Sequence, residues 1–390
     1  MLIYFAYLTL ICLVIFYLCF IAYIKFNYPF WSRMHMHHSY NILNAFSPEG
    51  IIKASSLEKS KWTNTNNINI IKYENITETQ EKKLIAFIRR HKIMNKHTVN
   101  KLTKNSLSCY LNFHNKLCFV GIYYEKPYYD NDNDNIIIGV ITSRPLLVRI
   151  KNKYFTTYFI ENLFIHKDKK NEIDKMAPEL IHSIIFKQQQ FNSSRTCLFE
   201  RPGILTIPTK TLLVYKTYLF TMEKWKSSKM LQLTYQLINI NINNVHILNE
   251  IFDKLTTLFK CSIFPCWSNI INMIKHKRVI IYLLSYNGTV LCAYFMRDPC
   301  IMHSDKNIIE CISTVNFSST PEIFIMGLND ILLSITKDYK NIIMHDLSHS
   351  SPLIETIMKK HVPIDQDNNH LFLYNFIQSS MKNSDCIIIN

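Results

Sequence analysis

The chain has 390 residues, of which 48% are hydrophobic and 19% are charged. This composition excludes an intrinsically disordered protein and supplies enough apolar surface for one large domain or two ordinary ones. The formal net charge is +15, but the basic residues are scattered without a dense block or an aromatic-basic repeat, so we do not expect a nucleic-acid partner.

The first element in chain order is an apolar stretch over residues 1–23, which carries no charged side chain. As a helix it is long enough to cross a hydrocarbon core of ~30 Å. The basic start and small-residue cleavage site of a secretory signal peptide are missing, so we predict a transmembrane anchor over residues 1–24. The alternative, a buried core helix, would show polar residues on one side.

Charge and cysteine usage both bear on the compartment. Lys25 and Arg33 follow the apolar stretch, and the positive-inside rule then puts the globular part in the cytosol. Eleven cysteines without a Cys-x-x-Cys pair fit a reducing compartment. Four Asn-x-Ser/Thr sequons favour the opposite alternative, a cell-surface glycoprotein, although chance matches are expected in an Asn-rich chain: Asn75, Asn192, Asn287 and Asn316.

Three histidines, His35, His37 and His38, lie just past the anchor. Imidazoles bind zinc or copper. Three rings so close in sequence, without a distant fourth ligand, are more typical of a patch at the membrane interface. We therefore predict no metal site.

The first half of the globular part begins with a helix. Thr77 and Gln80 form a capping box, and apolar residues follow at helical spacing. Apolar runs separated by polar turns then predict an antiparallel meander, with strands over residues 117–124, 136–142, 146–150 and 158–165. A second helix is expected from about Met176.

The second half repeats this order. An amphipathic helix is expected over residues 245–259, and Asn287-Gly288 joins two alternating apolar runs as a hairpin. Further helices and strands are expected over residues 324–335, 342–344, 351–360 and 371–376. Because helix, hairpin, strand, helix and strand occur twice, we predict an α+β protein of two similar lobes packed together.

A charged elbow separates the strand that ends at Ile165 from the helix expected near Ala177-Pro178. Pro178 suits the first helical turn, where an N–H group is not needed. The unpaired amides of that turn attract anions such as a pyrophosphate, and the candidate charge partners are Lys167, Lys169, Lys170 and Lys175. The alternative is an ordinary solvated connection between a strand and a helix.

From about residue 60 onward, the sequence resembles the N-myristoyltransferases. The family's strand ending Asn-Phe-Leu-Cys-Val-His, its basic loop and its Ala-Pro-x-Leu-Ile run are matched by "LFIHK" (163–167) and "APELI" (177–181). "IIIGVITSRPLLVRI" (136–150) is similar to the family's Val-Gly-Phe-Ile-Ser-x-x-Pro strand pair, and "CIIIN" (386–390) to its apolar last strand. Phe30-Trp31-Ser32 resembles its Phe-Trp arm over the acyl-CoA.

The resemblance implies two tandem acetyltransferase-like lobes that form one N-myristoyltransferase-like unit. Residues 25–60 would be a juxtamembrane arm, residues 61–225 an acyl-CoA-binding-like lobe and residues 226–390 a peptide-binding-like lobe. It also implies transfer of a fatty acyl group from myristoyl-CoA, or another acyl-CoA, to the N-terminal glycine of an acceptor protein. The acyl-CoA is a co-substrate, and no permanently bound cofactor is expected.

Site residues are carried over by position. The backbone amides of Asn162 and Leu163 would polarise the thioester carbonyl, and the terminal carboxylate of Asn390 would take a proton from the glycine amine. One backbone amide that donates to the developing oxyanion stabilises the transition state by ~3 kcal/mol. The residues implied in acyl-CoA binding are Phe30, Trp31, His166, Lys167, Lys169, Lys170, Lys175, Ala177 and Pro178.

Departures from the family pattern leave a second interpretation open. The basic loop is about two residues longer than in the family and contains Glu172 and Asp174, and Glu161-Asn162 replaces Asn-Phe at the supposed oxyanion site. The family's acidic, peptide-gripping stretch corresponds to the basic residues 91–101, and its Gly-Asp-Gly to residues 365–370. The alternative is therefore a catalytically inactive descendant, kept as a membrane-tethered scaffold or lipid-binding module.

Overall fold

The computed structural model describes residues 2–92, 97–126, 135–223, 225, 231–232 and 234–390. Its α-helices are α1 (Leu2–Asn27), α2 (Ile42–Phe46), α3 (Glu78–His91), α4 (Lys104–Leu111), α5 (Ile173–Phe191), α6 (Ile247–Leu258), α7 (Trp267–Lys275), α8 (Pro321–Ile335) and α9 (Ser351–Met358). The 3-10 helices are η1 (Trp31–Arg33), η2 (Tyr73–Asn75), η3 (Lys167–Glu172) and η4 (Asn383–Asp385).

The strands are β1 (Gly50–Ile51), β2 (Ile68–Lys72), β3 (Thr98–Asn100), β4 (Phe119–Tyr124), β5 (Ile137–Ile150), β6 (Lys153–Ile165), β7 (Cys197–Pro202), β8 (Leu213–Thr221), β9 (Tyr235–Asn239), β10 (Cys261–Phe264), β11 (Val279–Tyr286), β12 (Thr289–Arg297), β13 (Ile301–His303), β14 (Lys306–Asn316), β15 (Asn341–His345), β16 (Asp365–Tyr374), β17 (Phe376–Ile377) and β18 (Cys386–Ile388).

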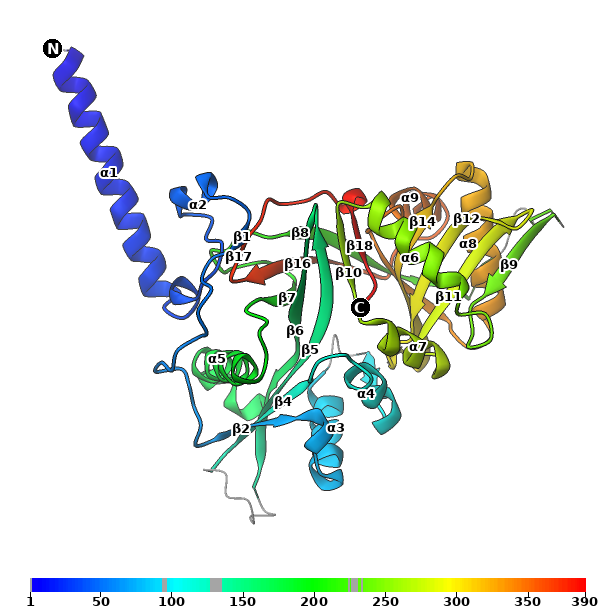
Figure 1. Ribbon diagram of the computed structural model, residues 1–390, viewed down its shortest axis with the longest axis horizontal. Coiled ribbons are helices and arrows are strands. Elements are labelled where there is room, and N and C mark those ends of the chain that lie inside the picture. The colour runs from blue at the N-terminus through cyan, green and yellow to red at the C-terminus, as the bar shows by residue number, and fades with distance from the viewer. Residues whose placement is uncertain (1, 93–96, 127–134, 224, 226–230, 233) are drawn as a thin grey trace.

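The predicted α+β architecture of two sheet-and-helix lobes is confirmed (Figure 1). Local signals explain where several elements begin. Thr77 and Gln80 close the capping box of α3, and Asn287 and Gly288 both have positive φ, as the two-residue turn between β11 and β12 requires. Successive side chains of β5 point to opposite faces of the sheet, and each face is covered by a different helix. Ile141 packs with residues of α5, and Val140 packs with residues of α3.

Sixteen strands form one sheet that runs through both lobes. β16 comes from the end of the chain, yet it lies between β7 and β8. β10 pairs with the second half of β5 and, on its other side, with β18. Strands from each half of the sequence are therefore inserted beside strands of the other half, which no local pattern specifies.

β5 differs from its prediction because it is one continuous strand of 14 residues rather than two strands on either side of Pro145. On one edge its pairs with β4 end at Ser143, and its pairs with β10 begin at Leu147. Pro145 lies where β5 changes neighbours. A residue without an N–H donor is tolerated there because that edge has no ladder hydrogen bond to lose.

The expected start of α5 is wrong by three residues, because the helix begins at Ile173 and not near Met176. Pro178 is therefore inside the helix and not in its first turn. The first-turn amides belong instead to residues beside Asp174. They follow directly on η3, which fills the charged elbow.

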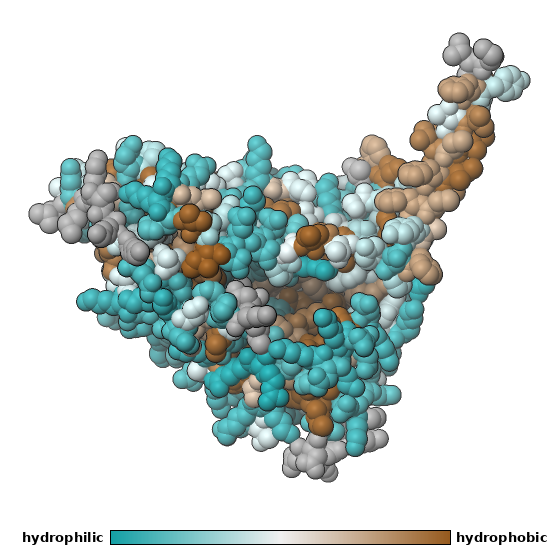
Figure 2. Space-filling view, turned by 180° about the vertical axis from the view of Figure 1, so that it is seen from behind, coloured by the Kyte–Doolittle hydropathy of each residue, from teal (hydrophilic) through white to brown (hydrophobic). Residues whose placement is uncertain are grey.

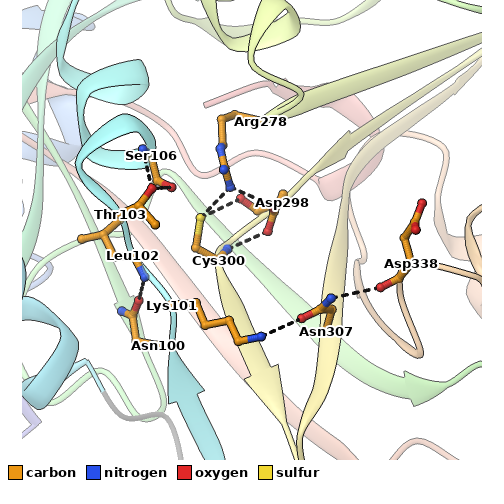
Figure 3. Close-up of polar contacts among 10 residues, drawn as sticks. All are labelled: Asn100, Lys101, Leu102, Thr103, Ser106, Arg278, Asp298, Cys300, Asn307 and Asp338. Carbon is orange, nitrogen blue, oxygen red and sulfur yellow. Dashed lines mark hydrogen bonds and ion pairs between the residues drawn. The ribbon is translucent and has the colours of Figure 1, made fainter.

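A second contact joins the lobes next to α4 (Figure 3). β3 of the first half pairs antiparallel with β13 of the second, and the Lys101 amide donates to Cys300 O at 2.7 Å. Lys101 Nζ also reaches Asn307 Oδ1 at 3.5 Å. Just before β13 in the chain, Asp298 Oδ2 is bound by Arg278 Nη1 at 2.7 Å. The two halves of the chain therefore meet through backbone as well as side-chain bonds.

α1 projects from the globular body (Figure 1). It is long and apolar enough to cross a membrane, and its spanning window is not buried by the protein. The histidines that follow do not form the predicted interfacial patch, because His37 and His38 are buried. His37 Nδ1 lies 3.0 Å from Gln378 O, and His38 Nε2 lies 3.1 Å from Met34 O.

Candidate active site

The candidate site centres on a β-bulge in β6. Val140 of β5 pairs with Phe164 and Thr142 pairs with Glu161, so Asn162 and Leu163 together oppose the single residue Ile141. Asn162 has a φ of 52°, a left-handed conformation that asparagine tolerates better than most residues. Its Nδ2 donates to Thr142 Oγ1 at 3.0 Å, which holds the bulge. A bulge interrupts the ladder and redirects main-chain groups.

The neighbouring strands diverge at the same place. β6 and β7 pair in parallel over three residues and last meet at Ile160 and Phe199. Beyond this point β6 continues beside β5 to Ile165, whereas β7 continues beside β16 to Pro202. The bulge therefore begins directly after the last pair between the two parallel strands.

Phe30 and Trp31 pack on the body close to this divergence. Their rings are 5.0 Å apart, and Trp31 lies 6.0 Å from Phe199 and 6.2 Å from Phe372 in edge-on contacts. Phe30 is buried. The segment after α1 is thus bound to β7 and β16 rather than hanging free.

Glu161, which precedes the bulge, is paired with an arginine that sequence reasoning missed. Its Oε1 lies 2.8 Å from Nε of Arg144, whose side chain is 0% exposed. The guanidinium carbon lies 5.7 Å from the centre of the Tyr110 ring and 5.5 Å from the centre of the Phe159 ring. Its two Nη atoms have no hydrogen-bond partner among the described residues. Arg144 offsets the carboxylate that would otherwise oppose negative charge at the bulge.

The last strand brings Asn390 into the interior. β18 pairs in parallel with β10, and the Ile389 amide donates to Ile263 O at 2.9 Å. Asn390 is 8% exposed. Its main-chain oxygen accepts a hydrogen bond of 2.7 Å from Arg297 Nη1, and its Oδ1 accepts a second one of 3.1 Å.

Arg297 belongs to a buried ionic network. Its Nη2 lies 2.7 Å from Glu310 Oε2, and Glu310 Oε1 lies 2.7 Å from His345 Nε2. Burial alone raises the pKa of Glu310, but Arg297 and then His345 outweigh it and hold the pKa well below its usual range. Burial likewise lowers the pKa of Arg297, and Glu310 more than reverses this. Glu310 and Arg297 therefore both stay charged.

Lys92, at the end of α3, connects the bulge and this network electrostatically. Burial lowers its pKa, Glu161 and Glu310 raise it, and Arg297 lowers it. Charges beside the bulge and charges beside Asn390 therefore both act on the Lys92 ammonium group. A charged residue inside an apolar strand is the sequence signal that could have identified Arg144 and Glu310.

Of the four elbow lysines predicted to bind phosphate, Lys169 is held in ion pairs and the other three are exposed. Lys169 Nζ is bound by Glu125 at 3.3 Å and by Glu172 at 3.5 Å. Lys167, Lys170 and Lys175 are exposed, and Ala177 and Pro178 follow one turn into α5. His166 caps η3 by accepting from the Asp168 amide at 3.3 Å. Glu172 thus turns toward a lysine, which reduces the repulsion that it would exert on a phosphate.

Two cavities lie elsewhere in the described structure. One has a volume of about 420 Å³ and is lined by residues that include Phe324 and His349. The other has a volume of about 340 Å³ and is lined by residues that include His114 and Cys118. Neither is lined by Asn162, Leu163 or Asn390, so the candidate site is defined by the bulge and the strand divergence.

Comparison with known proteins gives the fold. No protein-family model and no curated protein sequence matches the chain. Three crystal structures of Saccharomyces cerevisiae N-myristoyltransferase are similar, each at 10% sequence identity. One with bound myristoyl-CoA has a TM-score of 0.67 and covers 91% of this chain and 94% of that chain. A second with myristoyl-CoA has a TM-score of 0.69, with 92% and 90% covered.

The third structure, with bound myristoyl-CoA and inhibitors, has a TM-score of 0.70 and covers 93% of this chain and 94% of that chain. At this level of identity the likeness concerns the fold. The chain therefore has the N-myristoyltransferase fold in a divergent sequence, as the resemblance predicted.

Proposed function

We propose that the chain is a membrane-anchored acyltransferase that moves a fatty acyl group from coenzyme A to the N-terminal glycine of an acceptor protein. One observation carries the proposal: the bulge at Asn162 and Leu163 lies at the residues predicted to provide the oxyanion amides. Main-chain donors survive side-chain replacement, so the altered Glu161-Asn162 pair does not remove them.

In the proposed reaction, the amides of Asn162 and Leu163 donate hydrogen bonds to the thioester oxygen as negative charge develops there. The glycine nitrogen forms a bond to the carbonyl carbon. The carbon–sulfur bond breaks, and the second proton that the nitrogen loses goes to the departing sulfur, so that coenzyme A leaves as the thiol. An α-amino group has a pKa of about 8, so the terminal carboxylate of Asn390 first accepts a proton from it.

The donor would lie where β6 and β7 diverge. Lys167, Lys170 and Lys175 are exposed beside the start of α5, where cations and the helix dipole together favour phosphate groups. Lys169 contributes less because two carboxylates already bind it. Trp31 and Phe30, packed on β7, would cover the acyl end of the donor.

Membrane anchoring by α1 completes the proposal. Lys25 and Arg33 follow the apolar helix, which favours a cytosolic body in a single-pass orientation. The Phe30–Trp31 arm begins only a few residues after α1 ends, so the donor site would be held close to the bilayer.

A second function, an inactive scaffold or lipid-binding module, is favoured by one specific contact. Arg297 binds the terminal oxygen of Asn390 at 2.7 Å. An ion pair stabilises the charged form of a carboxylate and so weakens it as a proton acceptor. If this contact persists when substrate binds, the fold would retain the donor site without catalysing transfer.

The test uses the full chain in lipid nanodiscs with myristoyl-CoA and a peptide that begins with glycine. Mass spectrometry should detect a peptide heavier by one myristoyl group, and the same peptide with an acetylated amine should remain unchanged. Calorimetry with myristoyl-CoA alone measures donor binding, and the transfer result then separates the two candidates. Binding with transfer supports the enzyme, binding without transfer supports the scaffold, and no binding contradicts both.

A further inference from the structure

The segment between the anchor and the body carries a cluster of exposed apolar side chains. In α2, Ile42 is 57% exposed, Leu43 is 76% exposed and Phe46 is 84% exposed. A helix of five residues does not fold alone, and surface apolar groups gathered in one patch mark a contact site. This patch, residues 42, 43 and 46, is called the α2 patch below.

The α2 patch has a fixed position relative to α1. Tyr17, in the middle of α1, donates its hydroxyl hydrogen bond to Tyr40 O at 3.0 Å. Tyr40 stacks on His38 with ring centroids 4.9 Å apart, and Asn41 accepts from the Leu43 amide as the cap of α2. α2 therefore lies beside the middle of α1, as Figure 1 shows.

His38 in turn connects the α2 patch to the body. Its two ring nitrogens lie 3.1 Å from Met34 O and 3.4 Å from Pro208 O, and the residue forms a bridge with Thr209. α1, α2 and the body are thus joined by short contacts at the level of Tyr17 and not only by the chain that follows α1.

This position limits how α1 can enter a bilayer. Residues 2–16 of α1, which precede the contact with Tyr40, span ~22 Å at the helical rise per residue. A hydrocarbon core is ~30 Å thick. The helix can cross it only if residues after Tyr17 also lie in the apolar region, and the α2 patch, held at that level, then enters the same region.

The surface matches this requirement. Figure 2 shows the apolar surface of the projecting helix continuing onto the adjoining part of the body. Phe26, near the end of α1, is 85% exposed, so apolar side chains extend along the helix to both sides of the level at which α2 lies.

We propose that the α2 patch inserts into the bilayer leaflet that faces the body and forms a second, non-spanning membrane contact. The proposal rests on α1 as the membrane span of the proposed function. Its partner is the lipid acyl region rather than another protein. With two membrane contacts the body has one orientation, and the Phe30–Trp31 arm faces the bilayer instead of rotating freely on a single helix.

Fluorophore labelling of the full chain in vesicles tests the contact. Of the free cysteines, Cys12 and Cys19 are exposed and the others are buried, so Cys12→Ala with Cys19→Ala gives a background without exposed thiols. Three single-thiol proteins are compared after labelling with an environment-sensitive dye: native Cys12, Phe46→Cys and Val362→Cys. Val362 is 85% exposed, as Phe46 is, and serves as the matched control.

Lipids that carry a spin label on their acyl chains should quench the dye at Cys12 and at position 46, and should leave position 362 unquenched. Aqueous iodide should give the opposite pattern. Quenching by lipid at Cys12 together with full quenching by iodide at position 46 overturns the α2 contact and leaves the anchor intact. If iodide also quenches at Cys12, the membrane span fails, and the α2 contact fails with it.

Discussion

The terminal oxygen of Asn390 lies 2.7 Å from Arg297 Nη1, and the same guanidinium lies 2.7 Å from Glu310. This contact ties the end of β18 to β12 and β14 in the other part of the sheet. It holds Asn390 in the interior, and in the proposed reaction it would compete with the proton for the carboxylate.

Extending the chain beyond Asn390 should abolish transfer. An appended Gly-Ser-Gly-Ser segment removes the terminal carboxylate from the network, and loss of a general base lowers a rate by ~100-fold or more. Myristoyl-CoA affinity, measured by calorimetry, should be unchanged because the extension removes none of the residues predicted to contact the donor. Asn390→Ala keeps the main-chain carboxylate and should remain active. An extended protein with undiminished turnover would remove Asn390 from the mechanism.

Breaking the pair between Arg144 and Glu161 should destabilise the protein. Arg144→Met leaves a largely buried carboxylate without its partner, which typically lowers the free energy of unfolding by ~3 kcal/mol. Glu161→Gln should be at least as harmful, because Arg144 is fully buried. The double variant should recover much of the loss. Denaturant unfolding of all four proteins gives the coupling energy, and strictly additive losses would contradict the pairing.

Stability should fall in mild acid through His182. Burial lowers the pKa of His182 to about 4, and Ser60 and Thr63 hydroxyls lie 3.0 Å from its two ring nitrogens. Above pH ~6.5 the ring is neutral in both states. As pH falls from there to ~4, only the unfolded state gains a proton, so the folded state loses up to ~3 kcal/mol.

The matched variant is His182→Gln, which keeps hydrogen-bonding capacity without the titration. Unfolding free energies measured from pH 7 to pH 4 should decline less steeply in this variant. Burial and Arg144 also lower the pKa of His114 to about 4, so part of the loss of unfolding free energy at low pH should remain in this variant. Parallel curves for the two proteins would show that His182 does not carry the effect.

Among the elbow lysines, Lys170 and Lys169 should differ in their effect on donor binding. Lys170→Ala removes an exposed cation and should weaken myristoyl-CoA binding by about threefold at low ionic strength, with a smaller effect at high salt. Lys169→Ala removes a cation already bound by Glu125 and Glu172 and should change affinity less. Equal losses measured by calorimetry would mean that Lys169 leaves its carboxylates when phosphate binds.

Much of the fold follows from the sequence because its signals are local. The capping box of α3, the Asn287-Gly288 hairpin and the amphipathic pattern of α6 each depend on residues within a few positions of one another. The signal at Pro145 was misread because a proline breaks a strand only where it removes a ladder bond. That depends on the change of neighbours from β4 to β10.

The position of the candidate site in the chain could be predicted from the sequence, but the charged residues that surround it could not. The resemblance to the N-myristoyltransferases pointed to Asn162 and Leu163, where the structure has a bulge. The roles assigned to these residues stay predictions. No local pattern indicated that Arg144 would neutralise Glu161 or that Glu125 would bind Lys169, because each pair forms only after separate segments have met.

By itself, the sequence determined where α3, α6 and the β11–β12 hairpin form, that one apolar helix precedes the body, and which family the site resembles. Only the tertiary structure decided that β16 enters between β7 and β8 and that Arg297 meets Asn390. It alone also decided that α2 is held beside the middle of α1. Secondary structure responds to neighbours a few residues away, whereas charge pairing and strand insertion depend on the register of the whole sheet.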